Sequence, residues 1–250
     1  MFDFYGKLSS EVYELDKPIG SSFGDVEYYL SRLKDIKGPI LEPATGTGRI
    51  LIPLLEAGLD VRGFDLSNEM LDICKNNCNK RNLNPELFTD KMEIFKTDTK
   101  YNAIIVPTGT FLLIYEREKS IKALKNFYNH LNKDGKLILD IEVQNNINEL
   151  EISNRSWTNE KDEIINLSTQ VMQIDYINQF TIYHNKYEKI KENKVIQNEL
   201  EKFVLRWYGI EEFKLILESL GYKNIIISSD YKYNIYPNKA GQIVTFEATK

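Results

Sequence analysis

Two segments decide the fold of this chain: Ile40-Leu41-Glu42-Pro43-Ala44-Thr45-Gly46-Thr47-Gly48-Arg49 and, further along, Val61-Arg62-Gly63-Phe64-Asp65-Leu66-Ser67. Together they predict a strand, a tight glycine turn, a helix, and a second strand that ends on a carboxylate. Gly46 and Gly48 carry no Cβ, so the turn lets a ligand approach the backbone closely. Asp65, at the tip of the second strand, is placed to accept hydrogen bonds from both hydroxyls of a ribose. The two segments therefore predict a nucleoside-binding half-fold.

The residues after the turn indicate which kinds of nucleoside ligand the site does not suit. A dinucleotide fingerprint has glycine at its first, third and sixth positions. Counted from Gly46, the third position is Gly48 but the sixth is Leu51. No Gly-Lys-Ser/Thr follows the turn, so the phosphate-cradling loop of nucleotide hydrolases is absent from the sequence. Both observations speak against a pyrophosphate site.

The motif from Leu41 to Arg49, taken with Gly63-Phe64-Asp65-Leu66-Ser67-Asn68-Glu69-Met70-Leu71, resembles the class I S-adenosylmethionine-dependent methyltransferases. It is similar to the small-molecule branch, whose first motif reads acid, x, Gly, x, Gly, Thr, Gly, Arg. Ala44 stands where that family has its first glycine. The resemblance implies S-adenosyl-L-methionine as cofactor and in-line methyl transfer to a nitrogen or oxygen of a small-molecule acceptor. The alternatives are a non-catalytic S-adenosylmethionine-binding protein and, more weakly, a nicotinamide-dependent oxidoreductase.

Composition sets bounds on partners and compartment. With 250 residues, 42% hydrophobic and 28% charged, the chain is expected to form a single domain. It has no apolar run of about 18 residues and no basic leader, so we expect a cytoplasmic protein without membrane contact. Cys74 and Cys78 are expected to be reduced thiols, and no metal site is predicted. The formal net charge of −5 disfavours a nucleic-acid partner. We expect a monomer or a homodimer.

Strands and helices alternate through the first half of the chain. A helix is predicted from Gly24 to Leu33, and a third strand is expected to end within residues 87–95. A buried strand at 101–106, a helix from Glu116 to Leu131 and a strand at 137–141 follow. This order predicts an α/β fold with a Rossmann-like, doubly wound, mostly parallel sheet. Residues 1–23 look mostly irregular, and the resemblance implies an antiparallel last strand at the sheet edge.

The pattern changes after the fifth strand. Residues 144–208 are predicted to form a small antiparallel β insertion, because short alternating segments follow one another there. They comprise residues 164–167, 170–176, 180–184 and 202–208. The insertion is expected either to act as a lid over the cofactor mouth or to form a dimer surface. A final helix around 210–220 and a strand pair complete the chain.

The cofactor site is predicted from the turn and the strand tips. Glu42 is placed to receive the ammonium group of the cofactor, and its alternative is a carboxylate that caps a loop. The resemblance implies a tyrosine from the N-terminal segment and an adenine contact after the third strand, where a charged turn without a ligand role is the alternative. Met70 is a cofactor neighbour or a core residue. The predicted cofactor-binding residues are Tyr13, Glu42, Ala44, Thr45, Gly46, Gly48, Arg49, Asp65, Leu66, Met70, Asp90, Lys91, Met92 and Pro107.

The acceptor site is predicted from the loop after strand 101–106 and from the insertion. Thr108 and Phe111 lie in that loop, and Thr108 or Thr110 is either a substrate contact or a turn stabiliser. The insertion supplies His184, a substrate contact or a sheet histidine, and the resemblance adds Arg206 and Tyr208. A neutral amine needs to be held in line with the methyl carbon and sulfur rather than deprotonated by a strong base. No catalytic base is predicted.

Overall fold

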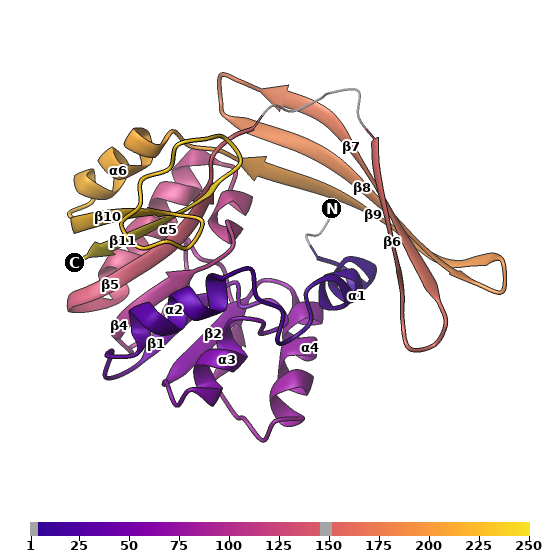
Figure 1. The fold of residues 1–250 in the computed structure, drawn as a ribbon, viewed down its shortest axis with the longest axis horizontal. Helices are drawn as coiled ribbons and strands as arrows, with labels where there is room; N and C mark the ends of the chain where they lie inside the picture. The colour runs from indigo at the N-terminus through magenta and orange to yellow at the C-terminus, as the bar shows by residue number, and fades with distance from the viewer. Residues whose placement is uncertain (1–4, 146–151) are drawn as a thin grey trace.

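The computed structural model describes residues 5–145 and 152–250 and places their strands in two separate sheets (Figure 1). In these residues seven strands form the large sheet, in the order β10-β11-β5-β4-β1-β2-β3. Four more form a second sheet in the order β6-β7-β8-β9. The strands of the large sheet are β1 (Ile40–Pro43), β2 (Val61–Asp65), β3 (Leu87–Thr89), β4 (Tyr101–Val106), β5 (Leu131–Glu142), β10 (Lys223–Ser229) and β11 (Ile243–Thr249).

The large sheet has the predicted mostly parallel, doubly wound arrangement. Strands β3, β2, β1, β4 and β5 pair in parallel, and β11 runs antiparallel to both β5 and β10. The last strand is antiparallel as predicted, but the prediction that it lies at the sheet edge is wrong. β11 pairs with β5 on one side and with β10 on the other, so β10 is the edge strand.

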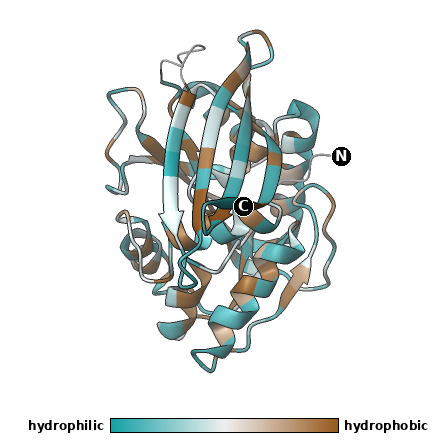
Figure 2. Ribbon diagram, turned by 90° about the vertical axis from the view of Figure 1, so that its right-hand side faces the viewer, coloured by the Kyte–Doolittle hydropathy of each residue, from teal (hydrophilic) through white to brown (hydrophobic). Residues whose placement is uncertain are grey.

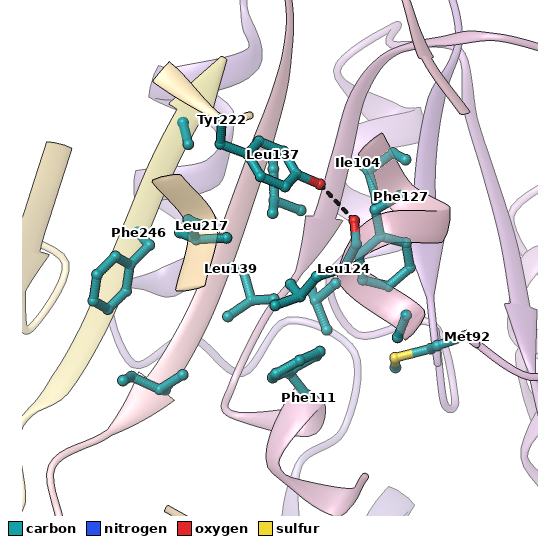
Figure 3. Packing of buried hydrophobic residues seen from close by; sticks show 14 of the residues in the cluster. Met92, Ile104, Phe111, Leu124, Phe127, Leu137, Leu139, Leu217, Tyr222 and Phe246 are labelled. Carbon is teal, nitrogen blue, oxygen red and sulfur yellow. Dashed lines mark hydrogen bonds between the residues drawn. The ribbon is translucent and has the colours of Figure 1, made fainter. Parts of the chain in front are cut away.

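Helices cover both faces of the large sheet because successive strand residues point to opposite sides. One cluster joins α2 (Asp25–Leu33), α3 (Leu51–Glu56) and α4 (Asn68–Asn79) to residues such as Ile105 and Ile138. The other joins α5 (Arg117–His130) and α6 (Ile210–Ser219) to Leu137 and Leu139. Figure 3 shows this second cluster, in which the Tyr222 hydroxyl donates to the Leu124 carbonyl at 2.9 Å. The two clusters hold the sheet from both faces and so fix the positions of its strand ends, where ligands of such sheets bind.

The second sheet arches away from the large one and corresponds to the predicted insertion (Figure 1). Its strands are β6 (Ile152–Thr158), β7 (Ile164–Asp175), β8 (Phe180–Lys191) and β9 (Lys194–Arg206). They are longer than predicted: the two segments expected at 164–167 and 170–176 belong to β7, and β6 was not predicted. Residues 146–151 of the expected insertion lie outside the described residues. Polar and apolar residues are mixed along these strands (Figure 2), and the buried side chains of the sheet include polar ones such as Asn185 and Glu201.

The expectation of a mostly irregular N-terminal segment is wrong. Residues Lys7–Asp16 form helix α1, which lies under the arch of the second sheet and beside α4 (Figure 1). Leu8 and Val12 pack against Ile165 and Tyr187 of the second sheet. The helix has no side-chain cap of its own. Instead Glu199 of β9 accepts hydrogen bonds from the first free N–H groups, those of Leu8 at 2.9 Å and Ser9 at 3.2 Å.

The remaining element boundaries agree with the predictions to within a few residues, except that β5 begins six residues earlier than the strand predicted at 137–141. Ser67 caps α4 as expected, because its hydroxyl accepts a hydrogen bond from the Met70 N–H at 3.1 Å. The third strand is short and ends at Thr89, and β5 begins directly after α5 at Leu131. A short 3-10 helix, η1 (Thr110–Leu113), follows β4. Within the described ranges, no helix combines the length and apolar character that crossing a bilayer requires.

Candidate functional site

The glycine turn brings the backbone of β1 against the carboxylate at the end of β2. Gly46 has a positive φ of 58°, and its N–H donates to Asp65 Oδ2 at 2.9 Å. The Ser67 N–H donates to Asp65 Oδ1 at 2.9 Å. A Cβ on Gly46 would meet only the Tyr13 ring, at 3.9 Å, so this position faces open space. The turn and the carboxylate therefore form one rigid unit.

Asp65 is a buried carboxylate held by backbone donors. Burial raises its pKa, and the hydrogen bonds from the N–H groups of Ser67, Gly46 and Leu66 act in the opposite direction. Gly46 donates to Oδ2 and Ser67 to Oδ1, and a carboxylate oxygen can accept more than one hydrogen bond. The two oxygens can therefore accept hydrogen bonds from a pair of neighbouring hydroxyls.

A cavity of about 280 Å³ opens in front of this unit, between the strand tips of the large sheet and the N-terminal segment. Its lining is mixed, with apolar side chains, tyrosines and several carboxylates. The lining residues are Tyr5, Tyr13, Ala44, Gly46, Phe64, Asp65, Leu66, Ser67, Met70, Asp90, Lys91, Met92, Glu93, Thr110, Leu113, Ile114, Tyr115, Glu116 and Lys119.

A second carboxylate lies behind the turn. Glu42, at the end of β1, is 2% exposed, and its Oε2 has no hydrogen-bond partner among the described residues. Burial raises the pKa of Glu42 well above its usual value; Arg49 lowers it, and the nearby carboxylates of Asp65 and Asp25 raise it further. A buried acceptor without a partner is costly. The site thus holds an open acceptor that suits a cationic group.

Arg49 is buried beside Glu42 but is bonded to another acid. Its Nη2 lies 2.5 Å from Asp25 Oδ2, and its Nη1 donates to the Ser21 carbonyl at 3.1 Å. Burial opposes the charge of Arg49, but the bond to Asp25 outweighs it, so the pKa of the guanidinium is raised. The pair ties the segment before α2 to the glycine turn.

The N-terminal segment forms one wall of the cavity through Tyr5 and Tyr13. The Ser67 hydroxyl donates to the Tyr5 carbonyl at 2.8 Å, and the Tyr5 N–H donates to Glu201 Oε1 of β9 at 3.0 Å. The Tyr5 ring packs edge-on against Tyr13 and against Phe203, with centroids 5.9 and 6.4 Å apart. Burial raises the pKa of both tyrosines, which keeps their hydroxyls protonated. A continuous set of contacts therefore links the second sheet to the loop that holds Asp65.

The structure brings most of the predicted cofactor residues together. Nine of them line the cavity: Tyr13, Ala44, Gly46, Asp65, Leu66, Met70, Asp90, Lys91 and Met92. The other five, Glu42, Thr45, Gly48, Arg49 and Pro107, are buried around the turn and the end of β4. Gly48 has a φ of 91°, and a Cβ there would lie 2.9 Å from Cys74 Sγ, so it allows close packing on α4.

The predicted acceptor residues lie in three different places. Phe111 is fully buried in the second core cluster (Figure 3), and its ring packs against the rings of Tyr208 and Phe213. Arg206 Nε donates to the Tyr115 carbonyl at 2.7 Å, next to the cavity wall. None of these predicted side chains lines the cavity among the described residues.

The remaining two predicted acceptor residues differ in their surroundings. Thr108 donates its N–H to Asp140 Oδ2 at 2.8 Å, in the loop that leads to the cavity wall. His184 pairs with Lys202 across β8 and β9, whereas its neighbour Asn185 pairs with Glu201. Because Glu201 contacts Tyr5, alternation places His184 on the opposite face of the second sheet.

Several cavity residues were not predicted from the sequence. Tyr5 and Ser67 come from the N-terminal segment and the α4 cap, and Glu93, Glu116 and Lys119 lie around the outer end of the cavity. Thr110 to Tyr115 follow β4, and the position of this loop at the carboxyl end of a parallel strand is a usable signal. Tyr5 carries no such signal, because a bond from β9 holds it in place.

The residues present fit S-adenosyl-L-methionine. Asp65 offers two acceptors for a ribose diol, and Glu42 offers an unpartnered buried acceptor for the ammonium group. Leu66 and Met92 supply apolar surface for a purine ring. Gly46 leaves room for a ligand at the turn.

Comparisons with known proteins agree with this geometry. The family of the methyltransferase domain matches residues 40–135, from β1 into β5. The putative methyltransferase YqeM of Bacillus subtilis (strain 168) is 24% identical over 216 residues, which cover 86% of this chain and 85% of that protein. The glycine/sarcosine N-methyltransferase of Aphanothece halophytica is 33% identical over 122 residues. That match covers 48% of this chain and 46% of the relative, so this chain aligns with less than half of it.

Solved structures share the whole architecture at low sequence identity. The sugar N-methyltransferase KedS8 from Streptoalloteichus sp ATCC 53650 has a TM-score of 0.77 at 17% identity, with coverage of 100% of this chain and 95% of that one. An S-adenosylmethionine-dependent methyltransferase from Clostridium acetobutylicum ATCC 824 has a TM-score of 0.75 at 18% identity, with 96% of each chain covered. These likenesses extend over both sheets.

Proposed function

We propose that this chain is a class I S-adenosylmethionine-dependent methyltransferase that transfers the methyl group of its cofactor to an amino nitrogen of a small polar molecule. Bound S-adenosyl-L-methionine supplies an electrophilic methyl group on a sulfonium. The protein's own task is to hold the cofactor and acceptor in line and to keep water out. Asp65 would hold the ribose and Glu42 the ammonium group, while Met92 and Leu66 would flank the adenine.

The cavity lining and the names of similar proteins together support nitrogen rather than oxygen as the accepting atom. The cavity lining includes tyrosines and carboxylates but, among the described residues, no histidine or cysteine. Tyr5 and Tyr13 have raised pKa values and stay protonated, so neither suits the removal of a proton from an alcohol. A neutral amine carries its own lone pair and needs only orientation. The names of the similar sugar and glycine/sarcosine N-methyltransferases support the same class of acceptor.

The cover of the site supports a small acceptor. Helix α1 contributes Tyr13 to the cavity lining and packs against the second sheet, which lies within the predicted insertion 144–208. We propose that α1 and this sheet act as the lid of the cavity in a single catalytic domain. Tyr5, Thr110 and Tyr115 are the lining residues that we expect to contact the acceptor. The net charge of −5 supports a small molecule rather than a nucleic acid.

Matched pairs of acceptors test this proposal. The purified protein is incubated with S-adenosyl-L-methionine and either glycine or glycolate, and either glucosamine or glucose, which differ by an amine in place of a hydroxyl. Release of S-adenosylhomocysteine and methylated product is followed by mass spectrometry. We expect methylation within the amine members only. Methylation of the hydroxyl members instead would contradict the proposal. Cofactor binding without transfer to any amine of a wider panel would favour a non-catalytic binding protein.

A further inference from the structure

A fully buried carboxylate lies beside the site and is not explained by cofactor binding. Asp140 is in β5, and three donors from different parts of the chain converge on it. The Thr108 N–H donates to Oδ2 at 2.8 Å, and the Tyr231 hydroxyl donates to the same oxygen at 3.2 Å. The Thr245 hydroxyl of β11 donates to Oδ1 at 2.7 Å. The carboxylate thus joins two loops to the centre of the sheet.

The surroundings of Asp140 hold no opposite charge. Among the described residues no lysine or arginine forms an ion pair with it, and the groups that face it are hydroxyls and a backbone N–H. From α2, the buried Tyr29 hydroxyl lies near Asp140 without a hydrogen bond of regular geometry to a described residue. Burial raises the pKa of Asp140 to about 6, while its hydrogen-bond donors act in the opposite direction. Burying a carboxylate without a positively charged partner costs free energy. The hydrogen bonds that Asp140 accepts offset this cost, and they are the structural role of the residue.

One of these bonds holds a strained turn. Thr108 has a φ of 56°, a left-handed conformation that a β-branched residue rarely adopts. Gly109 follows with a φ of 70°, and the Thr110 hydroxyl donates to the Pro107 carbonyl at 2.9 Å. The chain then enters η1 and continues to Tyr115, and several of these residues form the cavity wall. Asp140 therefore anchors the first residue of the loop that walls the cavity.

The other bond reaches a second loop at the same end of the sheet. Tyr231 also has a left-handed φ, of 58°, and packs against the Tyr28 ring with centroids 5.8 Å apart. Ligands of open α/β sheets lie at the carboxyl ends of the strands. Both loops tied by Asp140 are at that end, although Asp140 itself does not line the cavity.

We propose that Asp140 is a positioning residue for methyl transfer, whose ionised carboxylate holds Thr108 in its left-handed turn and thereby fixes the wall formed by residues 110–115. This inference rests on the proposed function. When Asp140 takes up a proton, the hydroxyl of Thr245 or Tyr231 can turn to accept it, so the Thr108 N–H then bonds to a neutral acid. A hydrogen bond to an ionised carboxylate is roughly twice as strong as one to a neutral acceptor. The anchor of the turn is then weaker, and the wall is held less firmly in the geometry that transfer requires.

The first test needs no variant. In the unsubstituted protein, the amide signals of Thr108 are followed by nuclear magnetic resonance from pH 4.5 to 8. We expect them to titrate with a midpoint near the pKa of Asp140, about 6. In the same titration, amide hydrogen exchange of residues 108–115, corrected for intrinsic rates, should rise as pH falls. A Thr108 signal that is insensitive to pH would overturn the proposal.

The second test uses a matched pair of buried substitutions. Asp140→Asn replaces one acceptor oxygen by a donor, and Thr245→Val removes only the neutral hydroxyl on the other oxygen. For Asp140→Asn we expect at least a roughly 10-fold faster exchange of the Thr108 amide, the loss expected for one hydrogen bond. We also expect a kcat lower by about 10-fold or more, with the Kd for S-adenosylhomocysteine changed less than about 3-fold. Thr245→Val should lower Tm without these changes.

The outcomes separate this inference from the proposed function. Equal effects of the two substitutions on residues 108–115 would show that Asp140 has only a general structural role, and would overturn the inference. Failure of the unsubstituted protein to bind S-adenosylhomocysteine would instead refute the methyltransferase function. The Thr108 titration would still decide whether Asp140 controls the turn.

Discussion

Replacement of Asp65 by alanine should weaken cofactor binding far more than it weakens the fold. Both Asp65 oxygens accept bonds from backbone N–H groups at 2.9 Å, and their remaining capacity faces the cavity. In the proposed complex each would accept a ribose hydroxyl. A hydrogen bond to a charged group contributes about 1.5–3 kcal/mol, so the loss of two amounts to about 3–6 kcal/mol. This corresponds to an affinity lower by about 100- to 20,000-fold.

The effect on stability should be smaller because two contributions oppose each other. Removal of the carboxylate removes the free-energy cost of burying a charged group, the same cost that raises the pKa of Asp65. It also leaves the N–H groups of Gly46 and Ser67 without their acceptors. Circular dichroism should show a folded variant. Its thermal midpoint should be measured beside every binding experiment.

Calorimetric titration with S-adenosylhomocysteine and its 2′-deoxy analogue measures the interaction directly. The unsubstituted protein should bind the analogue more weakly than the parent ligand, and Asp65→Ala should show little difference between the two. A folded Asp65→Ala variant with unchanged affinity would refute the reasoning. So would a variant that keeps full discrimination against the 2′-deoxy analogue.

Three further predictions follow from the turn, from Glu42 and from α1. Ala44 has a left-handed φ of 53°, so Ala44→Gly should stabilise the protein by up to about 1 kcal/mol in urea unfolding, whereas Ala103→Gly in β4 should destabilise it. Because burial raises the pKa of Glu42 well above its usual value, binding of a cationic group should release protons, detectable by calorimetry in buffers of different ionisation enthalpy, and Glu42→Gln should abolish that release. A raised pKa also means that the folded state holds a proton on Glu42 more tightly than the unfolded state does, so stability falls as pH rises above the usual carboxyl pKa, and Glu42→Gln should reduce that fall. Glu199→Gln should cost about 1–2 kcal/mol of α1 docking, seen as faster amide exchange of residues 7–16, and Glu188→Gln on the opposite face of the sheet should not.

The part of the site built from local contacts could be predicted from the sequence. The turn and Asp65 lie within 20 residues of each other, and Gly46 and Asp65 are joined by a direct hydrogen bond. The Ser67 cap is set by its own helix. Such features leave a local signature, because each residue type is needed for a backbone geometry or a bond a few residues away.

Helix α1 could not be predicted in the same way. Its apolar residues Leu8 and Val12 are covered by the second sheet, and its N-terminus is capped by Glu199, more than 180 residues away. No local cap marks the start of the helix. The position of Tyr5 over the cavity depends on Glu201 in the same way. Both depend on contacts that form only when the second sheet is present.

For the predicted acceptor residues, the sequence gives the element in which each lies but not the direction in which its side chain points. The sequence shows that His184 lies in a strand, but the face it occupies depends on the pairing register of β8 with β9. A shift of one residue would exchange the two faces. Phe111 follows β4 as expected, yet it packs against Tyr208 and Phe213 in the core. The loop position alone does not tell a core residue from a ligand contact.

The central claim is that the cavity beside Asp65 binds S-adenosyl-L-methionine. Calorimetric titration of the unsubstituted protein with S-adenosyl-L-methionine, S-adenosylhomocysteine and NAD under one set of conditions tests it most directly. We predict saturable binding of the first two ligands with a stoichiometry of about one per chain, and no binding of NAD. Binding of NAD alone, or of none of the three to the folded protein, would contradict the account.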